Sequence, residues 1–470
     1  MGMMDVRKRV AVGGLALALA IASPAAAVAE NLADALSSAY NNSGLLTQYR
    51  AVLRAADEDV AVAVSALRPV IGWSGSVEYS KSRSRSAFFP VTSSGTSASL
   101  GLGLDWVIWN GGSSRLTIDA KKEAVLATRA ALVGVEQNIL LQAVDAYMSV
   151  RSSSETVALR QNNVRVITEE LRAAKDRFEV GEVTRTDVAQ AEARLAAARS
   201  AFAQAQGDLV SAQEYFKAAV GRRPGALVPP PAVPATAKTM AEAKSVAVRN
   251  HPDVKKAQHE AAAADLVVAI TRASAKPTVS IGTSLGLVEN FDSTNFAKSG
   301  SVSLEVTGPI YAGGKVSALY RQAIANRDSA RANLLVTSQS VERSVGTAFS
   351  NLKVARAART AFGQQVRAAT VAFRGVREEA TLGARTTLDV LNAEQELLDA
   401  QASLISARNS EYVVAYSLLE AMGLLTAEHL KLQVQRYDEA AYYNQVKNGP
   451  ASVSKQGRQL ERVLKSLGKK

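Results

Sequence analysis

The chain has 470 residues, and 55 lysine and arginine residues outnumber 43 aspartate and glutamate residues, so its formal net charge is +12 at neutral pH. It contains no cysteine, which excludes disulfide bonds and thiolate metal sites. The excess positive charge is spread along the chain rather than clustered, and we expect no nucleic-acid partner.

Residues 1–29 have the pattern of a secretory signal peptide. Basic residues 7–9 precede an apolar run over 10–21, and Ala-Val-Ala at 27–29 provides a small-residue cleavage site. A membrane anchor is the alternative, but a spanning helix needs roughly 18 or more apolar residues and this run is shorter. We therefore expect an exported chain that begins at Glu30. No other stretch reads as a spanning helix, so the mature chain is either soluble or a transmembrane β-barrel.

The mature sequence is duplicated. The motif WNGG at 109–112 recurs as YAGG at 311–314, 202 residues later, whereas Pro69 recurs as Pro277, 208 residues later. Fixed-period self-similarity indicates structural repeats. We expect repeat 1 over 30–221, a proline-rich linker over 222–238, repeat 2 over 239–423, and a C-terminal periplasmic segment with a basic tail over 424–470.

Each repeat is predicted to hold three helices, at 31–67, 113–179 and 184–220 in the first and at 240–275, 315–381 and 386–422 in the second. The two longest contain no proline, and at 1.5 Å per residue each would extend roughly 100 Å. Residues 184–220 carry apolar side chains at alternating spacings of three and four, including Val188, Ala191 and Leu195. This period predicts a left-handed coiled coil. A coiled coil without a pore fits the same pattern.

Four strands are expected, at 70–80, 97–108, 278–289 and 299–310, with polar turns over 82–96 and 290–297. Apolar and polar residues alternate in each strand, as Leu100, Leu102 and Leu104 do with Ser99 and Gly101. Soluble sheets alternate in the same way, but four strands cannot close a barrel, since about eight is the smallest. An open sheet would also expose its edges. We therefore expect a mixed α and β membrane protein in which two or three copies share one barrel.

The chain resembles the TolC family of outer-membrane efflux and secretion proteins. The resemblance covers almost all of the mature chain. It rests on the mature start ENLADAL, the strand-to-helix joints WNGGSSRL and IYAGGKVS, and the turn signatures RFEVGEVTRTDVAQAEARL and ATLGARTTLDVLNAEQELL. It implies a homotrimer with a 12-stranded β-barrel in the outer membrane of a Gram-negative bacterium and an α-barrel through the periplasm.

The resemblance also implies a function. The expected protein is a passive exit duct, without enzymatic activity or cofactor, for type I protein secretion, multidrug efflux or both. Its expected partners are outer-membrane lipid, a periplasmic adaptor (membrane fusion) protein, and an inner-membrane transporter of the ABC or RND type that opens the duct at its periplasmic end. The alternative is a periplasmic coiled-coil adaptor or structural scaffold without a pore.

Two turns are candidate contact sites for the adaptor, because the resemblance makes them the periplasmic tips. A glycine just past a helix end is also the usual left-handed cap, which explains its presence structurally. Glu182 departs from the small apolar residue typical of the family. The tip residues are Val180, Gly181, Glu182, Leu382, Gly383 and Ala384.

The resemblance places an entrance gate beside the second tip. Three copies of Asp389 would form a carboxylate ring that favours cations, with mutual repulsion raising the pKa values. The family often has a second aspartate where this chain has Asn392, so we expect a weaker ring. Arg385 is expected to latch the gate through Thr186 and Asp187. The alternatives are a helix-dipole charge for Asp389 and a solvated surface charge for Arg385. We predict no catalytic or metal site.

Overall fold

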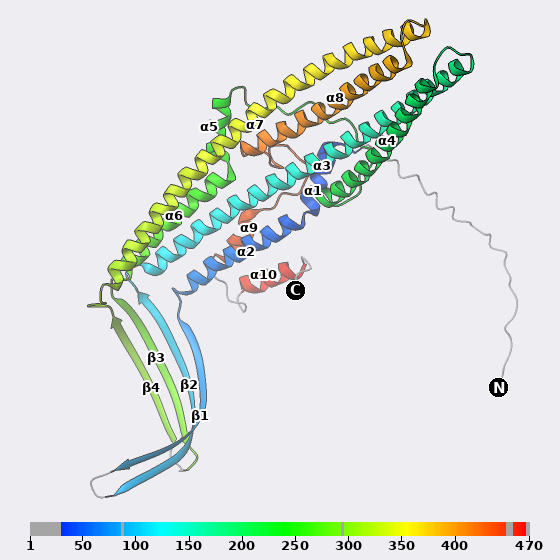
Figure 1. The fold of residues 1–470 in the computed structure, drawn as a ribbon. Helices are drawn as coiled ribbons and strands as arrows, with labels where there is room; N and C mark the ends of the chain where they lie inside the picture. Colours follow the sequence, from blue (N-terminus) through cyan, green and yellow to red (C-terminus); the bar gives the residue numbers. More distant parts are fainter. Residues whose placement is uncertain (1–29, 86–88, 293–295, 448–454, 467–470) are drawn as a thin grey trace, which may run out of the picture.

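The computed structural model describes residues 30–85, 89–292, 296–447 and 455–466. The predicted signal peptide and parts of the basic tail lie outside these residues. A body of long, nearly parallel helices occupies one end of the molecule, and four strands project from it as a single sheet (Figure 1). The described residues therefore separate into a helical part and a strand part that meet at one junction.

The sheet is an antiparallel meander of order β1-β2-β3-β4. The strands are β1 (Val70–Arg85), β2 (Pro90–Trp109), β3 (Thr278–Asn290) and β4 (Phe296–Thr307). Val70 lies opposite Asp105 in the first hairpin, and Thr278 lies opposite Thr307 in the second. These pairs are related by the repeat offsets of 208 and 202. The two hairpins therefore have the same register, and β1 and β4 are left as edges.

The strands differ in length from the expected ones. Turns were predicted over 82–96, but β1 runs to Arg85 and β2 starts at Pro90. The extra residues of β1 alternate serine with lysine or arginine, and those of β2 are mostly serine, threonine and glycine. Both segments therefore lack the alternating apolar face by which strands are recognised, although their backbones still pair. β4 spans 296–307 rather than 299–310, because Gly308 and Pro309 follow and proline has no amide hydrogen to donate.

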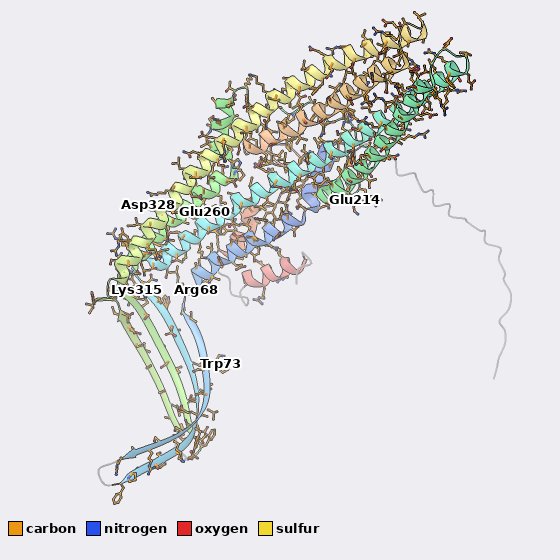
Figure 2. All side chains as sticks on the ribbon, in the orientation of Figure 1. Arg68, Trp73, Glu214, Glu260, Lys315 and Asp328 are labelled. Atoms are coloured by element: carbon orange, nitrogen blue, oxygen red, sulfur yellow. The ribbon has the colours of Figure 1, made fainter. Side chains whose placement is uncertain are left out.

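One face of the sheet is apolar and faces solvent in the single chain. Trp73, Val77 and Tyr79 on β1 are exposed, as are Val302 and Leu304 on β4. Figure 2 shows the side chain of Trp73 standing clear of the rest of the protein. The opposite face carries serine and glycine. An outward apolar band with a polar interior is typical of transmembrane barrels.

The helical part contains α1 (Leu32–Asn42), α2 (Gly44–Ser65), α3 (Ser113–Glu179), α4 (Arg185–Val220), α5 (Met240–Asn250), α6 (Pro252–Ala273), α7 (Lys315–Thr381), α8 (Thr387–Ala421), α9 (Glu439–Val446) and α10 (Lys455–Ser466). The helices expected over 31–67 and 240–275 are each divided in two, so those predictions were wrong. Ser43 is extended and caps α2 with its hydroxyl. His251, at the equivalent position, is extended because Pro252 disfavours helix in the residue before it.

The largest core lies where α3 meets α1, α2 and α4. Tyr147 is fully buried there, and its hydroxyl shares its one hydrogen between the carbonyl oxygens of Val228 (2.6 Å) and Glu30 (3.1 Å). This tyrosine therefore joins Glu30 and the linker to α3. By length and composition α3 also contains a stretch apolar enough to cross a membrane, contrary to expectation, and part of that stretch is buried in the protein.

The C-terminal segment packs on the first repeat. Leu425 and Ala427 are buried in the same core, and α9 lies against α2. The amide of Ala427 donates to Glu136 on α3 (2.7 Å), and the hydroxyl of Tyr442 donates to Glu58 on α2 (2.6 Å). Residues 424–447 thus form a strap across α2 and α3.

Candidate functional site

The first tip joins α3 to α4 at the end of the helices farthest from the sheet (Figure 1). Gly181 has φ +83°, and its amide donates to the carbonyl of Phe178 (3.0 Å). The amide of Glu182 donates to the carbonyl of Arg177 (2.9 Å). This pair of bonds is the Schellman motif, which satisfies the last carbonyls of a helix and favours glycine in the left-handed position.

The second tip repeats this geometry between α7 and α8. Gly383 has φ +78°, and its amide donates to Ala380 (3.2 Å), while the amide of Ala384 donates to Glu379 (2.9 Å). Each tip presents an apolar side chain to solvent, with Val180 72% and Leu382 85% exposed. Both turns are therefore hydrogen-bonded caps, and each displays a strongly exposed apolar residue.

Asp187 and Asp389 begin the returning helices. Each is the third residue of its helix, and its carboxylate accepts from the amide and hydroxyl of the capping threonine, Thr184 or Thr386. These hydrogen bonds to the charged form lower the pKa of both carboxyls. In the single chain Asp389 is thus held as a charged cap, as the helix-terminus alternative predicts, and Thr186 lies exposed in the first turn of α4.

Arg385 does not meet its expected partners in the single chain. Its guanidinium pairs with Glu379 across the tip (Nε to Oε2, 2.8 Å), not with Thr186 or Asp187. This hydrogen bond raises the pKa of Arg385 further. Glu379 was not singled out from sequence, because only the folded turn brings together two residues six positions apart.

The two tips lie beside each other and enclose a cleft of about 710 Å³. Asp187 and Glu182 line it from the first repeat, and Arg385, Asp389 and Leu382 line it from the second. The structure therefore brings most of the expected gate residues into one place. Thr186, Asn392, Val180 and Gly181 are not among the lining residues.

Contacts between the repeats continue along the helices below the cleft. Asn392 accepts from Arg194 on α4 (3.0 Å), and Glu394, which is buried, accepts from Asn163 on α3. Leu391 is buried among apolar residues of α3 and α4. In α8 the three-and-four spacing of apolar residues recurs as Val390, Ala393, Leu397 and Ala400. Leu391 and Glu394 each follow one of these heptad residues by one position, a signal that could have indicated a second helical neighbour.

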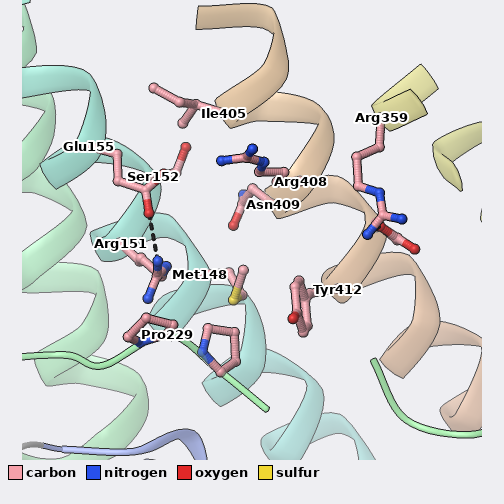
Figure 3. A pocket seen from close by; sticks show the side chains of 12 residues that line it. Met148, Arg151, Ser152, Glu155, Pro229, Arg359, Ile405, Arg408, Asn409 and Tyr412 are labelled. Atoms are coloured by element: carbon pink, nitrogen blue, oxygen red, sulfur yellow. Dashed lines mark hydrogen bonds and ion pairs between the residues drawn. The ribbon is translucent and has the colours of Figure 1, made fainter. Parts of the chain in front are cut away.

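A separate cavity of about 250 Å³ lies between α3, α8 and the linker (Figure 3). Arg151 in its wall pairs with Glu155 (2.8 Å), and Glu411 pairs with Arg359 (3.1 Å) and Arg356 (3.7 Å). Glu411 is the residue that interrupts the heptad pattern of α8, and these two arginines of α7 compensate its buried charge. Among the described residues, no group of three or more His, Cys, Asp or Glu could hold a metal ion.

Known proteins share this architecture. Residues 35–222 and 244–424 match the family described as outer membrane efflux protein, which confirms the two repeats. The outer membrane efflux protein BepC of Brucella suis is 36% identical over 425 residues, covering 90% of this chain and 92% of BepC. The outer membrane protein TolC of Vibrio cholerae is 25% identical over 417 residues, covering 85% and 92%.

A solved structure supports the fold. The CmeC outer membrane channel of Campylobacter jejuni aligns with a TM-score of 0.74 at 18% identity, covering 90% of both chains. Channels of this family are non-enzymatic trimers that work with adaptors and inner-membrane pumps. The chain belongs to the outer membrane efflux protein (TolC) family and is an outer-membrane channel of tripartite efflux and secretion systems that extends into the periplasm.

Proposed function

We propose that three copies of this chain form one passive exit duct, whose periplasmic end is opened by an adaptor bound at the tips and by an inner-membrane transporter. The observation that best supports this proposal is the pair of adjacent, hydrogen-bonded tips, which expose the apolar side chains of Val180 and Leu382 to solvent. Solvent-exposed apolar side chains on stiff turns suit insertion between the helices of a partner. The remaining tip residues, Gly181, Glu182, Gly383 and Ala384, set the shape of that contact.

The strand part supports a shared barrel. β1 and β4 are unpaired edges, and an open sheet with a lipid-facing apolar side cannot stay in a membrane. Three chains supply 12 strands, which leaves room for a lumen. In a periplasmic scaffold without a pore, the apolar face of these strands would remain exposed to water.

The gate is proposed to combine charge repulsion with a latch. Asp389 from three copies would face one entrance, where a carboxylate ring favours cations and repels anions. Arg385 is free to exchange Glu379 for Asp187 of a neighbouring chain, because both side chains of its present pair are about half exposed and solvent-exposed ion pairs contribute little to stability. Asn392 in place of a second carboxylate makes the ring weaker.

The duct is tested by extraction and conductance. Protein purified from outer membranes in detergent should have the mass of a trimer and should form cation-preferring channels of small conductance in planar bilayers. A monomer that washes off membranes with salt would refute the proposal.

Adaptor binding is tested by photo-crosslinking in cells. A crosslinker at Glu182 or Ala384 should capture a periplasmic adaptor, whereas one at exposed Val210, on α4 away from the tips, should not. Equal capture from all three positions would argue against tip docking. The type of pump, and hence the cargo, is identified by deleting the gene. Loss of secreted proteins would indicate protein secretion with an ABC transporter, and increased drug sensitivity would indicate efflux with an RND-type transporter.

A further inference from the structure

The two strand-to-helix joints have the same sequence pattern but different surroundings. At the first joint Gly111 (φ +68°) lies against the end of α6, so that a Cβ there would be 2.8 Å from Lys276 Cδ and 3.0 Å from the carbonyl of Ala273. At the second joint Gly313 (φ +58°) has nothing within 4 Å of the same position. The end of a helix from the other repeat covers the first joint, and the second joint is open.

The residues just before each double glycine are also less exposed at the first, covered joint than at the second, open joint. Ile108 and Trp109 at the first joint are 48% and 46% exposed, whereas their counterparts Ile310 and Tyr311 are 104% and 88% exposed. The open joint borders a mainly apolar cleft of about 660 Å³ between α7 and the end of α6. The residue pair at the covered joint is thus about half as exposed as its counterpart at the open joint.

We infer that this cleft is filled by the α2–β1 elbow, residues 65–69, of a neighbouring copy of the same chain. The elbow is the repeat counterpart of residues 273–277, which cover the first joint. It keeps the proline, as Pro69 for Pro277, and a basic residue, as Arg68 for Lys276. The inference rests on the proposed trimer and specifies how its chains meet.

The positions of the two surfaces suit a ring. Arg68 and Lys315, which mark the elbow and the open joint, lie on opposite sides of the junction between sheet and helices (Figure 2). The elbow leads directly into edge strand β1, and the joint directly follows edge strand β4. One antiparallel pairing of β4 with β1 of the next copy would therefore bring elbow and joint together.

The repeat also gives the register of that pairing. Ser99 on β2 lies opposite Val288 on β3. The offsets of 202 and 208 convert this pair to Ser301 on β4 and Ser80 on β1 of the neighbour. Both are small side chains on the polar face, so the two edges are compatible at this position.

The same relation extends along the helices. Asn163 donates to Glu394 across the seam between the repeats within one chain. The counterparts are Gln365 and Glu192, again an amide and a carboxylate, which would face each other between copies. Glu192 also pairs with Lys175 of its own chain (2.8 Å). Retention of this complementary pair supports one packing scheme for both seams.

Disulfide crosslinking tests the register, and the chain has no native cysteine to interfere. Purified trimer carrying S80C and S301C should become covalently linked under mild oxidation. Within one chain the two residues lie on strands separated by two others, at least about 14 Å apart, so only neighbouring copies can be linked. The control pair S76C and S301C is displaced by four residues, about 13 Å, and should stay unlinked.

Glycine substitutions test the elbow contact. Gly313→Ala should lower the dissociation temperature of the trimer in detergent by about 5 °C more than Gly314→Ala does. Gly314 is the matched control: its φ is +82°, and Gly112, its counterpart in the covered joint, has nothing within 4 Å. The inference would be overturned if only the control pair, S76C and S301C, became linked, or if Gly313→Ala and Gly314→Ala had equal effects. In both cases a mass measurement would still show an intact trimer. Absence of any trimer would overturn the proposed function as well.

Discussion

Asp57 is a buried carboxyl whose removal should stabilise the protein. It lies on α2 beneath the strap of residues 424–447, it is 0% exposed, and neither carboxylate oxygen has a hydrogen-bond partner among the described residues. Burial raises its pKa from 3.8 to about 6, although the positive charge of Arg129 on α3 opposes the rise and Glu58 adds to it. Arg54 of α2 and Tyr437 and Tyr442 of the strap complete its ionisable surroundings.

The magnitude follows from linkage. The folded pKa lies about two units above the unfolded value, and each unit corresponds to about 1.4 kcal/mol, so ionisation of Asp57 costs about 3 kcal/mol at pH 7. The contribution of Asp57 to the free energy of unfolding is fully present below pH 3.8, and it is lost as the pH rises through 6. Asp57→Asn should therefore stabilise the protein by up to about 3 kcal/mol at pH 7 and have little effect at pH 4.

The second repeat offers a matched control. Asp265 and Arg331 are the counterparts of Asp57 and Arg129, but they form a half-exposed ion pair at 2.9 Å. Asp265→Asn should change stability by less than about 1 kcal/mol. Thermal unfolding from pH 4 to 8 gives the overall effect, and hydrogen exchange of α9, corrected for intrinsic rates, reports on the strap. A destabilising Asp57→Asn at pH 7, or equal effects of both variants, would refute the reasoning.

The remaining predictions concern the tips. Asp389→Ala and Asp187→Ala each remove the carboxylate that completes a capping box with Thr386 or Thr184, and each should destabilise the tip beside it. The effect should be lost at acid pH, because the carboxylate of the unsubstituted protein then protonates, at a pH below 3.8. Only Asp389→Ala should weaken block by multivalent cations in planar bilayers, and equal block in both variants would contradict the ring. Arg385→Ser should enlarge conductance while changing the melting temperature little, and unchanged currents would reject the latch. Gly383→Ala should destabilise the second tip by about 1 kcal/mol, because alanine disfavours φ +78°, and faster hydrogen exchange there would measure it.

The large features could be read from sequence because they depend on local patterns. The duplicated WNGG motif marks where the sheet meets the long helices, and the proline-free heptads identify helices whose length needs no tertiary information. The glycines at 181 and 383 mark the turns for the same reason. Each of these signals depends on a few neighbouring residues whose backbone preferences are strong.

The remainder depends on contacts distant in sequence. The break at Ser43 was missed because serine tolerates a helix, and only the capping geometry shows that α2 begins there. The outer ends of β1 and β2 were missed because backbone pairing continues where side-chain alternation becomes polar throughout. The pairing of Arg385 with Glu379 depends on the exact path of a tip, and a family pattern suggested a different partner. Buried Asp57 gives no sequence signal, since a strap nearly 400 residues away covers it.

The unequal hairpins have a consequence for the outer mouth of the duct. The last residue pair of the first hairpin, Arg85–Pro90, lies four residues beyond the position equivalent to Glu289–Phe296 in the second, about 13 Å along the strand. In a ring of three copies, three long hairpins would alternate with three short ones. The outer end of the long hairpin turns aside from the line of the sheet (Figure 1), so the mouth would carry three bent arms with threefold symmetry above a wall that is close to sixfold. Material leaving the cell would pass these arms rather than an even collar.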